Sequence, residues 1–175
     1  MKKVLLVLSS VREGRIADKI LEQVKTELEN YPELEVDVAD FKEMPLPLID
    51  TPFSPNADEF APTDENVKKW TNKVEEADEI IFLVAEYNYS FTAILKNAID
   101  WIGKPWNDKP VSYIGYGWAG GTRATKHLRD VMGSTLAARS NDVEANLYFT
   151  KNIQIDGSPI DDSAKEAINS VLKTL

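Results

Sequence analysis

The chain contains no cysteine, and this absence excludes several chemistries at once. Disulfide bridges, thiolate nucleophiles and cysteine-ligated metals all require a thiol. Long apolar runs are missing too, because no stretch approaches the ~20 residues that cross a bilayer. We therefore expect a soluble, cytoplasmic protein without a membrane partner. The N-terminal MKKVLLVLSS is apolar only from Val4 to Leu8 and lacks a small-residue cleavage site before Arg12, so we interpret it as a buried strand.

Positive charge is scarce as well. The chain has 20 Lys and Arg against 29 Asp and Glu, a formal net charge of −9. This surplus repels phosphate backbones and argues against a nucleic-acid partner. A site for an anion would have to concentrate the few cations, and Arg12 and Arg15 are the candidates. The single histidine, His127, is better explained as a solvated helical side chain than as a catalytic base, and no carboxylate pattern predicts a metal site.

The patterning of apolar residues predicts a regular alternation of strands and helices. A length of 175 residues fits one core, so we expect a single domain over residues 1–175. Short continuous apolar runs indicate buried parallel strands, and apolar residues at helical spacing indicate the helices between them. We predict a long proline-containing loop at 41–63, strands at 3–8, 34–39, 80–85, 110–115 and 143–149, and helices at 16–28, 64–77, 94–102, 122–136 and 161–174.

Five strands that alternate with helices predict an α/β fold, a doubly wound five-stranded parallel sheet with helices on both faces. In such sheets ligands bind at the carboxyl ends of the strands, where the strand order reverses. The segments that follow strands one, three and four are therefore the ones to examine. They are loop one, SSVREGR (9–15), loop two, EYNYS (86–90), and loop three, YGWAGG (116–121).

Loop one has the donors that a phosphate needs. It joins a strand to a helix, so its backbone N–H groups and the positive end of the helix favour an anion. Ser9 and Ser10 supply hydroxyls, and the guanidinium groups of Arg12 and Arg15 can each hold two phosphate oxygens. The alternative is that the two serines cap the helix while the arginines lie in solvent.

Other phosphate motifs do not match. The chain has no Gly-x4-Gly-Lys-Ser/Thr string, and the turn after the first strand contains only Gly14 where a dinucleotide fingerprint needs three glycines. Asp40 follows the second strand, as a ribose-binding acid would, but lies about 30 residues beyond the turn instead of the usual ~20. These mismatches weaken the alternative hypothesis that the protein is a dehydrogenase that uses only a nicotinamide cofactor, but they do not remove it.

Loops two and three suit a flat heterocycle. Loop two places Glu86, Tyr87, Asn88 and Tyr89 directly after a buried strand. Aromatic rings and amides in this position provide the ring contacts and hydrogen bonds that a flavin needs, although the aromatics could instead fold back onto the core. The glycines of loop three give its backbone the freedom to approach a ligand closely; they are Gly117, Gly120 and Gly121.

With these loops in place, the chain resembles the NADPH-dependent FMN reductase family, which is flavodoxin-like and includes quinone, azo-dye and chromate reductases. The likeness covers about residues 3–140 and is carried by SSVREGR, AEYNYSFTAILKNAIDW and KPVSYIGYGWAGGTRATKHLRDVM. The second of these motifs is long and specific, and all three occur in the family's order and spacing. Two residues depart from the pattern, since Ser9 stands where the family usually has Gly and Ala85 where it usually has Pro.

The resemblance implies FMN as cofactor and NADPH or NADH as co-substrate. It implies that Ser10, Arg12 and Arg15 bind the FMN phosphate, that loop two borders the isoalloxazine ring, and that loop three completes the pocket. It also implies a homodimer, with a dimer of dimers as the alternative. The predicted cofactor-binding residues are Ser9, Ser10, Arg12, Arg15, Ile16, Glu86, Tyr87, Asn88, Tyr89, Gly117, Gly120 and Gly121.

The predicted activity is transfer of hydride from NAD(P)H through FMN to a quinone, flavin, azo or similar small-molecule acceptor by a ping-pong mechanism. Because the flavin performs the redox step, no protein residue is expected to be catalytic in its own right. Two further alternatives remain: an FMN-binding electron carrier, and an interaction module that is controlled by the flavin's redox state. Neither would oxidise NAD(P)H rapidly.

Overall fold

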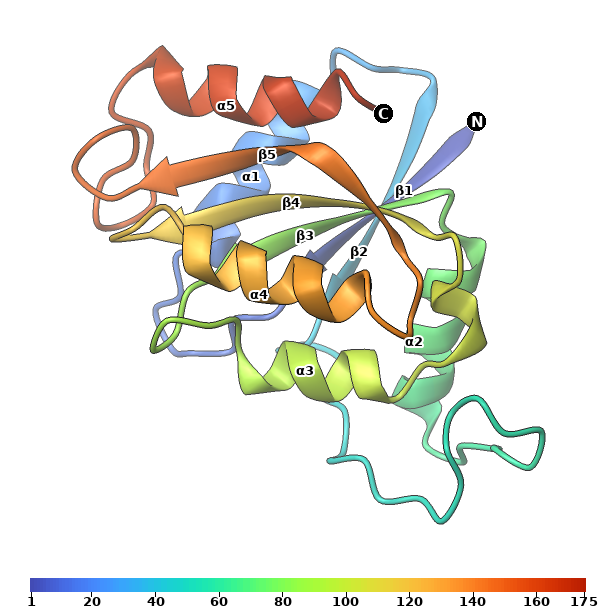
Figure 1. The fold of residues 1–175 in the computed structure, drawn as a ribbon. Helices are drawn as coiled ribbons and strands as arrows, with labels where there is room; N and C mark the ends of the chain where they lie inside the picture. Colours follow the sequence, from blue (N-terminus) through green and yellow to red (C-terminus); the bar gives the residue numbers. More distant parts are fainter.

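The computed structural model describes residues 1–175 and contains one sheet of parallel strands (Figure 1). The order across the sheet is β2-β1-β3-β4-β5. The chain therefore runs from β1 outward to β2, and then returns past β1 to build β3, β4 and β5 on the other side. This arrangement confirms the predicted fold class. The strands are β1 (Lys2–Leu8), β2 (Leu34–Asp40), β3 (Glu79–Ala85), β4 (Pro110–Gly117) and β5 (Arg139–Tyr148).

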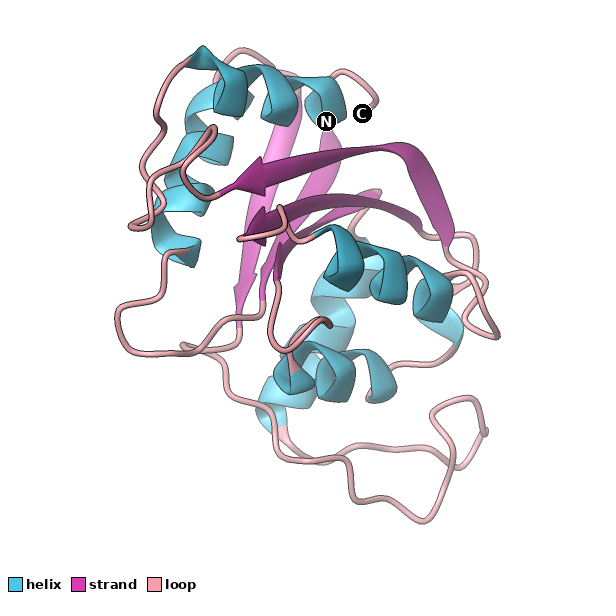
Figure 2. Cartoon of the chain, turned by 60° about the vertical axis from the view of Figure 1, so that its left-hand side comes forward, coloured by secondary structure: helices cyan, strands magenta, loops and turns pink.

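Helices cover both faces of the sheet, and each face has its own apolar core (Figure 2). Helices α1 and α5 pack on one face, and α2, α3 and α4 on the other. No helix is both long enough and apolar enough to span a bilayer. The helices are α1 (Ala17–Leu28), α2 (Glu65–Glu76), α3 (Ala93–Asp100), α4 (Thr122–Met132) and α5 (Asp162–Leu172), with a short 3-10 helix at Lys104–Trp106.

Strand position explains the sequence pattern of each strand. In β1, Leu5 and Val7 contact the core under α2, α3 and α4, while Leu6 and Leu8 contact the core under α1 and α5. A strand covered on both faces needs apolar residues at every position, which is why its sequence is a continuous run. Strand β2 lies at the sheet edge and keeps exposed acidic residues, as its alternating sequence predicts.

Side-chain hydrogen bonds fix the helices on the α2–α3 side of the sheet. Asp64 caps α2 by accepting from the backbone N–H groups of Asn66 and Val67, which confirms the predicted start of that helix. Trp70 on α2 is fully buried, and its indole N–H donates to the carbonyl of Ala98 over 2.8 Å. Trp106, at the end of the short 3-10 helix, is fully buried as well.

Two boundaries differ from the prediction by more than two residues. Helix α4 ends at Met132 instead of 136, because the chain turns after Gly133. Strand β5 begins at Arg139 instead of 143. The residues of β5 before 143 are polar and lack an apolar signal, yet Arg139 and Ser140 pair with the start of β4, ahead of an irregular register between Val111 and Tyr113. Backbone pairing at a sheet edge does not require apolar side chains.

Candidate functional site

A cavity of about 360 Å³ lies at the carboxyl edge of the sheet, where all three predicted loops meet. The strand order reverses beside it, since β1 leads to α1 on one face while β3 leads to α3 on the other. The loops after these adjacent strands therefore diverge and leave a hollow between them. The lining residues are Ser10, Arg12, Glu13, Gly14, Arg15, Ile16, Ala85, Glu86, Tyr87, Tyr116, Gly117, Trp118, Phe149 and Ile155.

The two arginines of loop one have different environments. The guanidinium of Arg15 donates to the Ser10 carbonyl over 2.8 Å and to both carboxylate oxygens of Asp40 over 2.6 and 2.5 Å. It also donates to Asp18 through Nε and Nη2. These bonds occupy all five N–H groups of the guanidinium. Arg12, by contrast, is exposed, makes no ion pair, and lies 5.8 Å from the ring centre of Tyr87.

The carboxylate of Asp40 belongs to this network. Burial is the largest single influence on its pKa and raises it, but hydrogen bonds from Arg15 and from the Lys42 backbone N–H, with the charge of Arg15, together lower the pKa below its ordinary value. The same pairing raises the pKa of Arg15. Asp40 thus stays ionised and holds Arg15 in place, rather than standing free for a ribose.

The helix-capping alternative for the two serines is wrong. Helix α1 begins at Ala17 after an N-cap residue, Ile16, that makes no side-chain capping bond. Ser10 instead pairs its hydroxyl with that of Tyr87 over 2.8 Å, which links loop one to loop two. Ser9 is buried, and its hydroxyl has no hydrogen-bond partner. Neither serine therefore caps the start of α1, and Ser10 lines the cavity.

Loop two forms a tight turn with unusual backbone angles. Tyr87 and Ser90 exchange two backbone hydrogen bonds of 2.7 and 3.0 Å, and between them Asn88 and Tyr89 have φ angles of +47° and +70°. A left-handed tyrosine is strained, and such strain often marks a functional segment. Tyr87 packs partly against the core, whereas Tyr89 is exposed. The guanidinium carbon of Arg123 lies over the Tyr89 ring, 3.7 Å from the ring centre.

An ion pair joins loop two to α4. Nη2 of Arg123 lies 2.5 Å from Oε1 of Glu86, whose side chain is only 8% exposed. The second carboxylate oxygen, Oε2, and the guanidinium Nε are both buried without a partner. Glu86 lines the cavity, while Arg123 stands behind it. A half-satisfied charged pair of this kind costs free energy and calls for an explanation.

Loop three needs its glycines mainly for its own packing. Gly121 has a φ of +71°, and a Cβ there would lie 2.5 Å from the backbone nitrogen of Tyr116. A Cβ on Gly120 would lie 2.7 Å from the ring of Tyr148. Gly117 lines the cavity, whereas Gly120 and Gly121 do not. The predicted residues Ser9, Asn88 and Tyr89 are likewise outside the lining.

Several site residues were not among those predicted. Tyr116 and Trp118 lie within the sequence of loop three, so their aromatic character was the available signal. Phe149 and Ile155 come from the connection after β5, whose sequence carries no motif that suggests a site. Trp118 packs edge-on against Phe149 with ring centres 5.4 Å apart. This contact extends the aromatic wall beyond loop three.

Buried polar atoms without partners gather at this edge. The structure has five such side-chain atoms, and four belong to Ser9, Glu86, Tyr116 and Arg123; the fifth is on Asn146. Burial, followed by the nearby Tyr87, raises the pKa of Tyr116, so its hydroxyl keeps its proton. A free guanidinium and hydroxyls beside aromatic walls suit an anion attached to a flat ring system. The residues present therefore fit a flavin mononucleotide.

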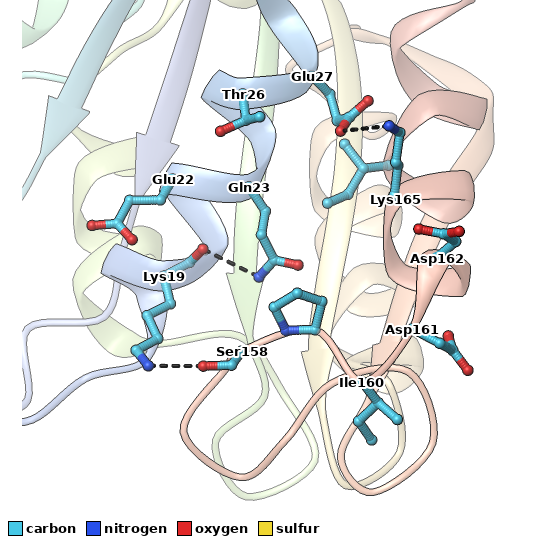
Figure 3. Close-up of a pocket in the computed structure, with 12 residues that line it drawn as sticks. Lys19, Glu22, Gln23, Thr26, Glu27, Ser158, Ile160, Asp161, Asp162 and Lys165 are labelled. Atoms are coloured by element: carbon cyan, nitrogen blue, oxygen red, sulfur yellow. Dashed lines mark hydrogen bonds and ion pairs between the residues drawn. The ribbon is translucent and has the colours of Figure 1, made fainter.

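A larger groove of about 570 Å³ lies between α1 and the segment that leads into α5 (Figure 3). Both lysines in its lining already have carboxylate partners. Lys19 pairs with Asp156 over 2.7 Å, and Lys165 lies 3.7 Å from Glu27. None of the buried atoms without a partner belongs to this groove. Volume alone does not make a site, and the smaller cavity has the more distinctive chemistry.

Comparison with known proteins shows which family and which folds the chain is similar to. A family described as NADPH-dependent FMN reductase matches residues 2–147. An NAD(P)H-dependent FMN reductase of Saccharomyces cerevisiae is 33% identical over 141 residues, which cover 74% of this chain and 73% of the yeast protein. An NADPH:quinone oxidoreductase of Arabidopsis thaliana is 34% identical over 154 residues, covering 84% and 76% of the two chains.

Among solved structures, a flavoenzyme NAD(P)H:acceptor oxidoreductase of Paracoccus denitrificans superposes with a TM-score of 0.76. The two chains are 23% identical, and the match covers 99% of this chain and 94% of the other. An azoreductase of Bacillus anthracis superposes with a TM-score of 0.61 at 20% identity, over 99% and 96% of the two chains. At these identities the likeness establishes the shared fold.

Proposed function

This chain belongs to the NADPH-dependent FMN reductase family, and we propose that it passes hydride from NAD(P)H through FMN, held at the carboxyl edge of the sheet, to a small-molecule acceptor. Quinones, flavins and azo compounds are the proposed acceptors. NAD(P)H and the acceptor would use the same cavity in turn, which is a ping-pong exchange. The observation that carries the proposal is the meeting of a free guanidinium, paired hydroxyls and aromatic walls in one cavity.

Loop one would hold the phosphate. Arg12 has free donors and lies beside Tyr87, and Ser10 presents a hydroxyl whose direction is set by its bond to Tyr87. Arg15 has no free donor, so we propose that it positions the loop by fixing the Ser10 carbonyl relative to Asp40. The two predicted phosphate-binding arginines would thus divide into one that binds and one that positions.

Loops two and three would hold the ring. Tyr87, Tyr116 and Trp118 supply aromatic surface, and Gly117 leaves room above the side chain of Glu86. When bound, FMN supplies the hydride acceptor and donor. The residues of the chain would bind and orient it, and Phe149 and Ile155, which line the same cavity, would border it on one side. No side chain needs to act as a general base in this scheme.

An anaerobic titration tests the proposal. The purified protein is reconstituted with FMN, its absorption spectrum is recorded, and stoichiometric NADPH and then a quinone are added. We expect the bound-flavin bands to bleach and then recover. Protein that binds no FMN would overturn the proposal. Bound FMN that responds to neither NADPH nor NADH would favour the electron carrier or the interaction module.

We further propose that two copies associate around this edge. Trp118 and Tyr89 are 69% and 66% exposed, and both lie on the loops that form or border the cavity. Large aromatic side chains at such exposure are common at interfaces. Light scattering after size-exclusion chromatography should give the mass of a dimer, or of a dimer of dimers, and a purely monomeric mass would contradict this proposal.

A further inference from the structure

The ion pair between Glu86 and Arg123 has features that the binding scheme above does not use. Glu86 is the only carboxylate that is both largely buried and part of the cavity wall, because Glu13 in the same lining is exposed. The other buried charge in the lining, Arg15, is neutralised by Asp40 and Asp18. The charge of Glu86 therefore faces the cavity with one partner, Arg123, bound through one of its two oxygens.

The fold holds this pair rigidly. Glu86 follows directly after β3, which fixes its backbone at the carboxyl edge of the sheet, and a Cβ on Gly117 would make only ordinary contact with the Cβ of Glu86, at 3.6 Å. Arg123 lies in the first turn of α4 and is held from its other side by the ring of Tyr89. A single guanidinium thus connects the carboxylate in the cavity wall to the strained turn of loop two. The Glu86 side chain is only 8% exposed, so its charge is largely removed from water, whereas the Arg123 side chain is 39% exposed.

A fixed charge beside a redox cofactor changes the cofactor's reduction potential. Hydride transfer from NAD(P)H moves two electrons and one proton onto the flavin, oxidises the nicotinamide to NAD(P)⁺, and leaves the flavin one unit more negative. A nearby carboxylate opposes this change, and a nearby guanidinium assists it. In a poorly hydrated cavity wall these interactions are screened less than in water.

We propose that Glu86 and Arg123 form an electrostatic pair that sets the reduction potential of the bound FMN, Glu86 lowering it and Arg123 raising it. This inference rests on the proposed function, because it requires FMN in the cavity. It assigns Arg123 a role toward the cofactor although Arg123 does not line the cavity. It also explains why a carboxylate with an unpartnered oxygen is kept there.

The test is spectroelectrochemical measurement of the midpoint potential of bound FMN. Glu86→Gln keeps the size of the side chain and an acceptor for Arg123 while removing the charge. We expect reduced FMN to bind about tenfold more tightly relative to oxidised FMN, which for a two-electron couple raises the midpoint by about 30 mV. Arg123→Gln should shift the midpoint in the opposite direction. Arg123→Lys, which keeps the charge but loses the flat stack on Tyr89, should stay near the wild-type value.

A second ion pair on α4 provides matched controls. Arg129 lies 3.1 Å from Glu144, and neither residue lines the cavity. Arg129→Gln and Glu144→Gln should therefore leave the midpoint unchanged. Bound FMN whose potential is the same in wild type, Glu86→Gln and Arg123→Gln would overturn the inference and leave the proposed function standing, as would shifts of equal sign in both variants. Wild-type protein that binds no FMN would overturn the proposed function and the inference together.

Discussion

Arg15 and Asp40 are joined by two hydrogen bonds of 2.6 and 2.5 Å, so that the guanidinium and carboxylate planes meet edge to edge. Asp40 ends β2 and Arg15 ends loop one, so the pair fixes the loop after one strand to the end of its neighbour. Paired charges in this geometry are stronger than ordinary hydrogen bonds. Arg12, three residues earlier, has no such partner. This contrast leads to the first prediction.

Replacing each arginine by alanine should separate binding from positioning. Arg12→Ala should weaken FMN binding by at least about tenfold, since a hydrogen bond to a charged group contributes about 1.5–3 kcal/mol, without changing thermal stability. Arg15→Ala should reduce both FMN affinity and stability, by about 3 kcal/mol for the latter, because it leaves Asp40 half-buried and unpaired. Fluorescence titration and thermal unfolding of the apoprotein measure the two effects. A normal FMN affinity for Arg12→Ala would contradict its proposed phosphate contact.

The depressed pKa of Asp40 predicts a loss of stability in acid. As the pH falls, Asp40 takes up its proton in the unfolded chain near the ordinary aspartate pKa of about 3.9. In the folded chain it does so only at a lower pH, because its pKa is lower there. The stabilisation is complete above the ordinary pKa and is lost as the pH falls through the folded value. Asp40→Asn should remove this component, so the difference in unfolding free energy between wild type and variant should shrink as the pH is lowered. A pH-independent difference would contradict it.

The hydroxyl bond between Ser10 and Tyr87 predicts a small, specific effect on binding. Tyr87→Phe should weaken FMN binding by about fivefold, because one hydrogen bond that orients Ser10, worth about 1 kcal/mol, is lost. Tyr89→Phe is the matched control, since its hydroxyl makes no hydrogen bond and its ring still stacks on Arg123. Equal losses of FMN affinity in the two variants would contradict the proposed orientation of Ser10 by the Tyr87 hydroxyl.

Two left-handed glycines should differ in their tolerance of alanine. Gly14→Ala, at φ +65° with nothing within 4 Å of a Cβ, should cost only the backbone penalty of about 1–2 kcal/mol. Gly121→Ala has the same penalty and would also place its Cβ against the backbone of Tyr116, which adds about 1–3 kcal/mol of overpacking. Chemical denaturation of the two variants should show the larger loss for Gly121→Ala. Equal losses would show that loop three relaxes freely.

The sequence determined the fold and indicated the place of the candidate site. Continuous apolar runs in β1 and β3 can exist only where both faces of a strand are covered, and the alternation of strands with helical stripes then specifies a parallel sheet. The carboxyl edge of such a sheet is where ligands bind, so loops one, two and three could be selected from their positions in the sequence. The motifs in these loops also indicated the family.

Only the tertiary structure decided what each residue does at the site. Arg12 and Arg15 have the same chemistry in the sequence, and they differ because Asp40, 25 residues beyond Arg15, comes to lie beside one of them. Arg123 pairs with Glu86 and Phe149 lines the cavity, although neither was among the residues predicted from the sequence, since contacts between distant segments depend on how the helices pack on the sheet. The sequence sets the periodicity that builds each helix and strand. The neighbours in space determine whether the charge of a side chain is paired and whether its donors are free to bind a ligand.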